Sequence, residues 1–198
     1  ANYWWTKNYK QTIVNSRVDL TRDLIDFLRA RQTKPKLLIS SSAIGYYGSW
    51  PGSAIDAEPI MLENSKPAGV GFMSEFCHTW EQTALVAQDF GTRVVLLRTG
   101  LVLDPQAGFL AKLLPTFRLG LCCRLGDGMQ WLSWIHLQDW LNAVKFLWQN
   151  SNARGAYNLT APQPIQNYLF TQKLAIAVNK YNWDKLSVPS FFINILFG

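Results

Sequence analysis

Apolar residues recur every three or four positions over the first part of the chain, from Thr6 to Arg31. The residues that show this spacing are Tyr9, Ile13, Val14, Val18, Leu24, Ile25 and Leu28. Such spacing places side chains on one face of a helix, so the pattern predicts an amphipathic helix over residues 6–31 with Thr6 as its N-cap. The next apolar run, residues 37–39, is continuous, which is typical of a strand covered on both faces.

The same two patterns alternate along the rest of the chain. A second helical face, ending at Gly91, is formed by Phe72, Phe76, Trp80, Ala84 and Ala87. Two further apolar runs, 92–100 and 156–160, predict buried strands, and residues 131–136 predict an extended segment. Residues 49–71 are rich in Gly, Pro and Ser, which indicates a loop.

Three more helices are expected in the second half of the chain. The first covers residues 109–119, where Pro115 is expected to kink or shorten it. The second covers residues 137–150 and the third residues 167–179. The apolar face predicted for the second of these helices consists of Leu137, Leu141, Val144 and Trp148.

Helices and strands therefore follow one another in turn, which predicts an α/β fold with a parallel sheet and flanking helices. A doubly wound sheet usually opens with a strand, whereas this chain opens with a helix. It also stops inside the apolar pattern of residues 190–198. We therefore expect the fold to be incomplete at both ends.

Composition narrows the classes of function. The 198 residues are 48% hydrophobic, enough for one domain with a core, and 19 basic against 13 acidic residues give a net charge of +6. Because the basic residues are scattered, we expect no nucleic-acid partner, and an anionic cofactor or substrate accounts for the charge equally well. No apolar run approaches the ~18 residues that span a bilayer, so we expect no membrane partner.

The cysteines indicate a reducing compartment. Cys77, Cys122 and Cys123 show no metal-binding spacing, and the adjacent pair does not form an ordinary disulfide. We therefore expect a cytoplasmic protein without a metal site.

Polar side chains and a glycine follow the three predicted strands. Residues 40–42 are three serines at the end of the first strand, Thr99 and Gly100 end the second, and Asn158 and Thr160 end the third. In an open parallel sheet, ligands bind beyond the carboxyl ends of the strands. These residues therefore mark the candidate site, although serines after a strand also form turns that bond their own backbone.

The segment LLISSSAIGYYG, residues 37–48, resembles the serine-bearing strand of the extended short-chain dehydrogenase/reductases. The resemblance covers essentially the whole chain and is specific to the bacterial epimerase-like branch of the NAD-dependent epimerase/dehydratase family, sometimes labelled cell-division-inhibitor-like. The further segments that follow one another as in that branch are TKNYKQTIVNSRVDLTRDLI, FCHTWEQTA, TRVVLLRTGLVL, LLPTFRLGL, WLSWIHLQDW and GAYNLTAPQPIQN.

The resemblance implies a Rossmann-type domain that binds a nicotinamide dinucleotide, with NADP favoured over NAD. Such domains open with a strand and a glycine-rich turn that holds the pyrophosphate, and no G-x-G-x-x-G occurs in this sequence. We therefore expect a partial Rossmann-type sheet that lacks its N-terminal βα units and its C-terminal tail. Residues 1–188 would form the incomplete domain, and residues 189–198 would begin a truncated C-terminal helical segment.

The resemblance also assigns catalytic positions. Ser42 would orient the substrate, and Glu81 marks the helix that carries the tyrosine and lysine of the superfamily. Counting back from Glu81 places Cys77 at the lysine and Met73 at the tyrosine position. Because methionine has no proton to give, ordinary carbonyl reduction would lose a group that typically contributes ~10²–10⁴-fold.

Two replacements for the missing tyrosine stay open. Tyr46 or Tyr47 could supply a phenol from the turn after Ser42, and His136 could act as acid or base beside the substrate. The competing interpretation is structural. Aromatic residues after a strand usually pack under a neighbouring loop, and a histidine beside tryptophans is usually part of the core.

The remaining contacts follow from the same resemblance. Ser41 and residues 100–102, Gly100, Leu101 and Val102, would line the nicotinamide, although Gly100 could simply end a strand. Arg118 could bind an anionic group of the substrate, because a guanidinium suits carboxylate or phosphate, or could be a solvated residue at a helix end.

Two functions are consistent with these residues. In the first, the parent protein is an NAD(P)-dependent epimerase or oxidoreductase that acts on a small or sugar-like molecule, as the serine strand favours. In the second, it binds the cofactor but has a degenerate catalytic site and serves as a sensor or interaction module, as Met73 and Cys77 favour. The oligomeric state stays open.

Overall fold

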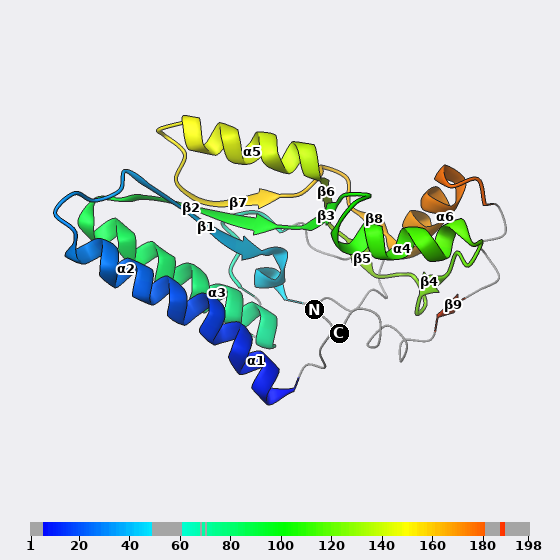
Figure 1. Cartoon of the computed structure of the whole chain (residues 1–198), viewed down its shortest axis with the longest axis horizontal. Coiled ribbons are helices and arrows are strands. Elements are labelled where there is room, and N and C mark those ends of the chain that lie inside the picture. The colour runs from blue at the N-terminus through cyan, green and yellow to red at the C-terminus, as the bar shows by residue number, and fades with distance from the viewer. Residues whose placement is uncertain (1–5, 49–60, 68, 70, 181–186, 189–198) are drawn as a thin grey trace.

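The computed structural model describes residues 6–48, 61–67, 69, 71–180 and 187–188. Its centre is a parallel sheet of β1 (Leu37–Ala43), β2 (Arg93–Thr99) and β7 (Gly155–Leu159) in the order β1-β2-β7 (Figure 1). These are the three strands that the apolar runs predict, so the α/β fold with a parallel sheet is confirmed. The expected helical segment at residues 189–198 lies outside the described residues.

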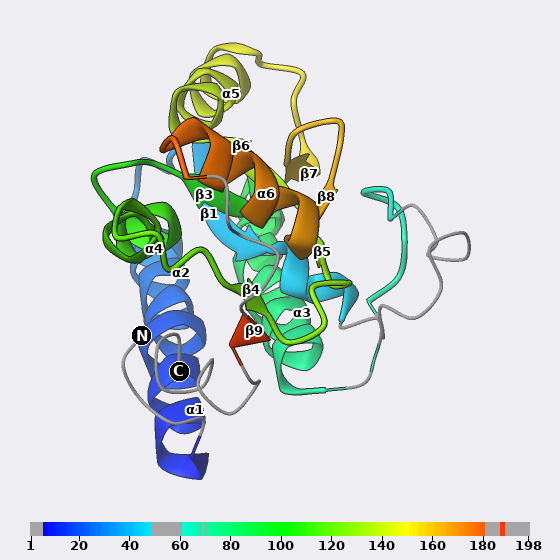
Figure 2. The same ribbon diagram turned by 90° about the vertical axis from the view of Figure 1, so that its right-hand side faces the viewer.

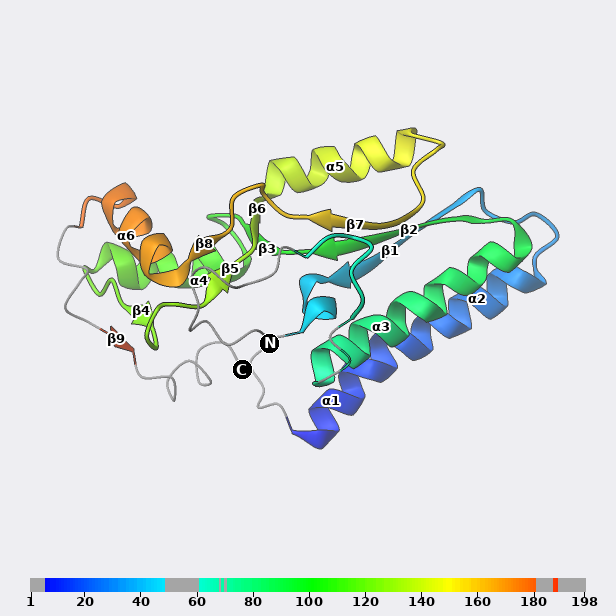
Figure 3. The same ribbon diagram turned by 180° about the vertical axis from the view of Figure 1, so that it is seen from behind.

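Helices α2 (Leu20–Ala30) and α3 (Phe72–Leu85) cover one face of the sheet, as opposite views show (Figures 1 and 3). Buried Ile25 and Ala84 pack there against Val94 and Leu96 of β2. A helix over residues 6–31 is confirmed in outline, but it is built from α1 (Lys7–Val14), the π-helical segment η1 (Asn15–Asp19) and α2.

The ends of these helices have clear physical causes. Thr6 is the N-cap of α1, because its hydroxyl accepts a hydrogen bond from the backbone N–H of Tyr9 at 3.2 Å. After α3 the chain makes a 3-10 turn, η3 (Val86–Phe90), and stops at Gly91, whose φ of 85° is left-handed. Both ends agree with the prediction from sequence.

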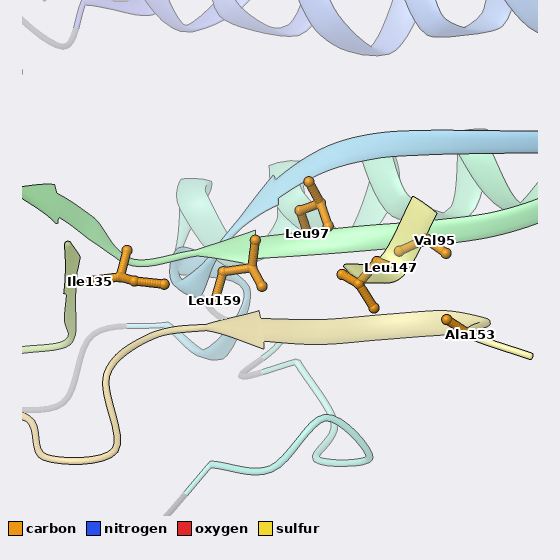
Figure 4. Close-up of a cluster of buried hydrophobic side chains, with 6 residues drawn as sticks. All are labelled: Val95, Leu97, Ile135, Leu147, Ala153 and Leu159. Atoms are coloured by element: carbon orange, nitrogen blue, oxygen red, sulfur yellow. The ribbon is translucent and has the colours of Figure 1, made fainter. Parts of the chain in front are cut away.

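Helix α5 (Leu137–Gln149) covers the opposite face of the sheet. Its one fully buried residue is Leu147, which packs among core side chains of β2, β7 and their neighbours (Figure 4). The predicted apolar face of this helix is therefore wrong in part, because Leu141 is 47% and Trp148 is 65% exposed. Apolar residues occur on two sides of α5, so periodicity could not select the side that includes Trp140 and Leu147.

A smaller lobe lies beyond the carboxyl end of the sheet (Figures 1 and 2). It contains α4 (Gly108–Arg118) and α6 (Asn167–Ala177), and α4 continues through Pro115, so Pro115 does not shorten it. Three short strand pairs complete it: β3 (Leu101–Leu103) with β6 (Trp134–His136), β4 (Arg124–Leu125) with β9 (Ser187–Val188), and β5 (Trp131–Leu132) with β8 (Ile165–Gln166). None of the described helices is long and apolar enough to cross a membrane.

The carboxyl end of α5 is held by Arg93, the first residue of β2. The Arg93 guanidinium donates to the carbonyl oxygens of Leu147 (3.1 Å), Trp148 (3.2 Å) and Ala153 (2.9 Å). Two of these carbonyls belong to the last turn of α5, where carbonyls lack partners within the helix and a positive charge is favourable.

We predict that Arg93→Met lowers the free energy of unfolding by about 1–3 kcal/mol, because it removes hydrogen bonds from a charged donor and leaves carbonyls unpaired. Urea titration followed by circular dichroism measures the loss. Lys145→Met is the matched control on the exposed side of α5 and should change stability by less than about 0.5 kcal/mol. Equal effects of the two substitutions would contradict this role of Arg93.

Candidate functional site

Three polar side chains form a row across the sheet near its carboxyl end. Ser42 of β1 lies opposite Arg98 of β2, which in turn lies opposite Asn158 of β7. Because side chains alternate between the faces of a strand, all three point to the face that α3 covers. Ser42 is 5% and Arg98 3% exposed, so a charged group stands inside the protein.

The charge of Arg98 is balanced by Glu81 of α3. Nε of Arg98 donates to Oε1 of Glu81 (2.9 Å) and Nη2 donates to Oε2 (2.8 Å), and the two side chains are only 4% and 3% exposed. Burial alone would lower the pKa of Arg98, but the hydrogen bonds to Glu81 and Tyr47 and the charge of Glu81 raise it above its ordinary value. Arg98 therefore stays charged.

The hydroxyl of Ser42 is part of the same network. Its Oγ donates to Oε1 of Glu81 at 2.6 Å, a short bond to a charged acceptor. While this bond is made, the Ser42 proton is not available to a ligand. The structure thus places the predicted substrate-orienting hydroxyl at the expected strand end, but in the interior.

Tyr46 and Tyr47 belong to the 3-10 turn η2 (Ile44–Tyr47) and are 7% and 6% exposed. The guanidinium carbon of Arg98 lies 3.5 Å from the ring centre of Tyr46, and its Nη1 donates to the Tyr47 phenol at 2.9 Å. The Tyr47 hydroxyl donates to Oδ1 of Asn158 at 2.7 Å. Burial raises the pKa of Tyr46, so this phenol holds its proton more tightly than a free tyrosine.

Met73 and Cys77 fill the space beside the turn that follows Ser42. A Cβ atom on Gly45 would lie 3.3 Å from Cε of Met73 and 3.8 Å from Sγ of Cys77. Cys77 is fully buried, and desolvation raises the pKa of its thiol to about 11. The two positions that the resemblance assigns to a tyrosine and a lysine are therefore packed and apolar.

Ser41 points to the opposite face from Ser42 and is exposed at the end of β1. Among the described residues its hydroxyl has no hydrogen-bond partner, so it is free to bond a ligand such as a nicotinamide ribose or amide. An exposed hydroxyl at the carboxyl end of a parallel strand is compatible with a hydrogen bond to a nicotinamide cofactor.

Residues Gly100 to Val102 connect the sheet to the smaller lobe. The N–H of Gly100 donates to the Leu159 carbonyl (3.1 Å), and the N–H of Leu101 donates to the Ser133 carbonyl (2.8 Å). Val102 pairs with Ile135 in the β3–β6 ladder. The backbone N–H groups of Gly100 and Leu101 are therefore both bonded within the chain. The glycine at position 100 also has a structural cause, because a Cβ atom there would lie 2.5 Å from the Ser133 carbonyl oxygen.

His136 and Arg118 lie in the smaller lobe and outside the network of Arg98. His136 is the N-cap of α5: its Nδ1 accepts a hydrogen bond from the backbone N–H of Gln138 at 3.1 Å. Arg118 is exposed in the last turn of α4. Both side chains thus have a local structural explanation, and neither lies among the groups that contact Ser42 in this structure.

Three participants in this network were not identified as site residues from the sequence: Arg98, Asn158 and Glu63, whose carbonyl oxygen accepts a hydrogen bond from Nη1 of Arg98 at 3.0 Å. Asn158 was noted only for its place after a strand, and Glu63 falls in the loop. Arg98 did carry a signal, because an arginine interrupts an otherwise apolar run that predicts a strand covered on both faces. A charge at such a position requires a buried partner, which Glu81 provides.

We predict that Gly100→Ala lowers the free energy of unfolding by about 1–3 kcal/mol, because the added methyl group would overlap the Ser133 carbonyl and the Thr160 methyl group. Gly45→Ala is the control, since its nearest neighbour is the flexible end of Met73 at 3.3 Å. Thermal unfolding of the two variants tests this. A larger loss for Gly45→Ala would contradict the account of Gly100.

The buried Cys77 thiol predicts a pH dependence of stability. Its pKa rises from 9.0 to about 11 on folding, so its contribution is complete below pH 9 and disappears between pH 9 and pH 11, where only the unfolded state loses the proton. Two pH units correspond to about 2–3 kcal/mol. Urea titrations at pH 8, 10 and 11 should show this decline, and Cys77→Ala should decline less by that amount. Equal slopes for the two proteins would refute the prediction.

Comparison with known proteins gives the context of this site. The model of the NAD dependent epimerase/dehydratase family matches residues 1–160. An epimerase family protein of Mycobacterium leprae is 37% identical over 98% of this chain and 60% of its own length, and one of Staphylococcus aureus strain MW2 is 36% identical over 100% and 63%. The chain thus spans about three-fifths of the length of these curated relatives.

Solved structures agree with the family model. The human epimerase family protein SDR39U1 (isoform 2), determined with NADPH, has a TM-score of 0.87 and 26% identity over 99% of this chain and 63% of its own. A nucleoside-diphosphate sugar epimerase from Corynebacterium glutamicum has a TM-score of 0.75 and 29% identity over 98% of this chain and 41% of its own. With a Rossmann-like parallel sheet and a serine-bearing first strand, the chain belongs to the NAD-dependent epimerase/dehydratase family.

Proposed function

We propose that this chain is the part of an NAD(P)-dependent epimerase or oxidoreductase that contacts the nicotinamide and the substrate. The substrate would be a small or sugar-like molecule. The observation that carries the proposal is the exposed hydroxyl of Ser41 at the carboxyl end of β1, the edge where ligands of open parallel sheets bind. A bound nicotinamide would accept or donate hydride at this edge.

In this proposal the two neighbouring serines have different tasks. Ser41 offers its free hydroxyl to the cofactor, and Ser42 keeps the strand end and η2 in place through its bond to Glu81. Ser42 can still accept a hydrogen bond from a substrate hydroxyl, because only its proton is used. Leu101 and Val102 give the nicotinamide an apolar border, and Arg118 and His136 stay candidate contacts to the substrate from the smaller lobe.

NADP is the proposed form of the cofactor. The human relative with the same fold was determined with NADPH, and the positive net charge of this chain suits an additional phosphate. The partner implied by this site is a small molecule rather than a macromolecule.

A second function is favoured by the packing around Ser42. Met73 and Cys77 are apolar and tightly packed, and both nearby phenols are buried. A proton relay of the kind that reduces a carbonyl needs a group within hydrogen-bond reach of the substrate. In this second function, the protein binds the nicotinamide cofactor as a sensor or interaction module and does not turn over a carbonyl substrate.

We predict that neither NADPH nor NADH binds the 198-residue chain alone. In a longer polypeptide, extended to the full length of the curated relatives, we expect NADPH to bind more tightly than NADH. Calorimetric titration of both cofactors into both proteins measures this. Absence of binding in the longer polypeptide would refute a nicotinamide-dependent function.

Turnover distinguishes the two functions once binding is established. Oxidation of NADPH is followed by its absorbance with a panel of small carbonyl and sugar substrates. The enzyme function predicts turnover that falls in Ser42→Ala and is retained in Ser40→Ala. Ser40 is a matched control because it lies on the same face of β1 and its hydroxyl, among the described residues, bonds only the neighbouring Ser41 carbonyl. Binding without turnover of any substrate in the unsubstituted protein would favour the second function.

A further inference from the structure

The polar network around Arg98 extends beyond Ser42 to a segment of the long loop. Met61, Leu62 and Glu63 lie where β2, β7 and η2 present hydrogen-bond donors. The Met61 and Glu63 carbonyl oxygens accept bonds from Asn158 and Arg98, and the Leu62 carbonyl lies 3.1 Å from the Tyr47 hydroxyl. We call Met61–Glu63 the wall segment.

Three side chains hold the wall segment. Nδ2 of Asn158 donates to the Met61 carbonyl (3.2 Å), the Tyr47 hydroxyl lies 3.1 Å from the Leu62 carbonyl, and Nη1 of Arg98 donates to the Glu63 carbonyl (3.0 Å). These donors come from β7, η2 and β2, which are far apart in sequence. The wall segment is therefore tied to the sheet and to η2 in addition to its local bonds with Ser65.

The side chain of Glu63 adds a hydrogen bond in the opposite direction, in which the wall segment supplies the acceptor side chain and β7 the backbone donor. Its Oε1 accepts a hydrogen bond from the backbone N–H of Asn158 at 3.0 Å. The same residue, Asn158, thus receives a bond from Tyr47 and bonds the wall segment twice. An exposed glutamate here also covers part of a backbone edge that would otherwise be free to pair.

The ion pair sets the direction of these bonds. Because Glu81 accepts from Nε and Nη2 of Arg98, the Nη1 group is directed away from Glu81 and towards Tyr47 and Glu63. A tyrosine oxygen that accepts from Arg98 is left with its own proton to donate to Asn158. The Tyr47 hydroxyl has one proton, and it lies within hydrogen-bond distance of both Oδ1 of Asn158 (2.7 Å) and the Leu62 carbonyl (3.1 Å), of which the first is the shorter contact.

We propose that Tyr47, Arg98 and Asn158 are positioning residues that hold the wall segment as a preformed boundary of the ligand site. It closes the carboxyl end of the sheet on the α3 side and leaves access from the side of Ser41. That this boundary borders a ligand rests on the proposed function, whereas its fixed position in the free protein does not.

Hydrogen exchange of the wall segment tests the fixed position in the 198-residue chain. The amides to follow are those of Leu62, which donates to Ser65 Oγ, and of Ser65, which donates to the Leu62 carbonyl. Tyr47→Phe should speed exchange of both by about tenfold, because it removes a buried donor. Tyr46→Phe, which removes an equally buried phenol from the same turn without a bond to the wall segment, should change it less than about twofold.

If Tyr47→Phe unfolds the protein, substitutions of the exposed Glu63 provide the same hydrogen-exchange test. Glu63→Ala removes the acceptor for the Asn158 N–H and should speed exchange several-fold, whereas Glu63→Gln keeps an oxygen there and should restore the original rate. Amides of β2 serve as the reference and should not change in either variant. Unchanged exchange at Leu62 and Ser65 in Glu63→Ala would overturn the proposal, as would equal effects of Ala and Gln.

A second experiment measures the same exchange rates with NADPH bound to the longer polypeptide. A preformed boundary predicts that saturating NADPH changes exchange at Leu62 and Ser65 less than about twofold, whereas a lid that closes on the ligand would protect them at least tenfold. Strong protection would overturn the preformed boundary. If NADPH does not bind at all, the proposed function fails, and the exchange rates of the free chain still decide whether the positioning residues act as stated.

Discussion

A carboxylate and a guanidinium, both almost entirely out of water, join α3 to the centre of the sheet. Moving two such charges out of water costs several kcal/mol per ion, and their attraction offsets this only when the geometry is good and the remaining donors are paired. Glu81 and Arg98 meet both conditions through two parallel bonds, with Ser42, Tyr47 and the Glu63 carbonyl as further partners. Removing either charge would leave the other buried and unpaired. The positions of η2, the end of β1 and Met61–Glu63 therefore all depend on this pair.

The network also separates the tasks of adjacent residues. Ser42 faces the ion pair and is buried, whereas Ser41 faces the other side of the sheet and is exposed. One step along a strand reverses the direction of a side chain, so a run of serines supplies both an internal anchor and an external ligand group. Tyr46 and Tyr47 divide in a similar way: the Tyr46 ring stacks against Arg98, and the Tyr47 hydroxyl lies within hydrogen-bond distance of Oδ1 of Asn158 and of the Leu62 carbonyl.

The packing of Met73 and Cys77 beside η2 limits the acid–base chemistry that α3 can supply. At the two positions that the resemblance assigns to a catalytic tyrosine and lysine, the structure has a methionine and a fully buried thiol. Burial disfavours the thiolate, so Cys77 stays a neutral thiol. Neither side chain is an acid or base that could serve a substrate at neutral pH.

The sequence by itself determined the fold class, the three core strands and most helices, because continuous apolar runs and three-to-four spacing reflect burial directly. It also predicted a candidate site at the carboxyl ends of the strands, since polar residues follow them. It could not decide which side of α5 is buried, because Leu141 and Trp148 are as apolar as Leu147. Nor could it show that Arg98, Glu81, Tyr47 and Asn158 form one network, because they are separated by up to 111 residues and a hydrogen bond depends on distances that only tertiary packing sets.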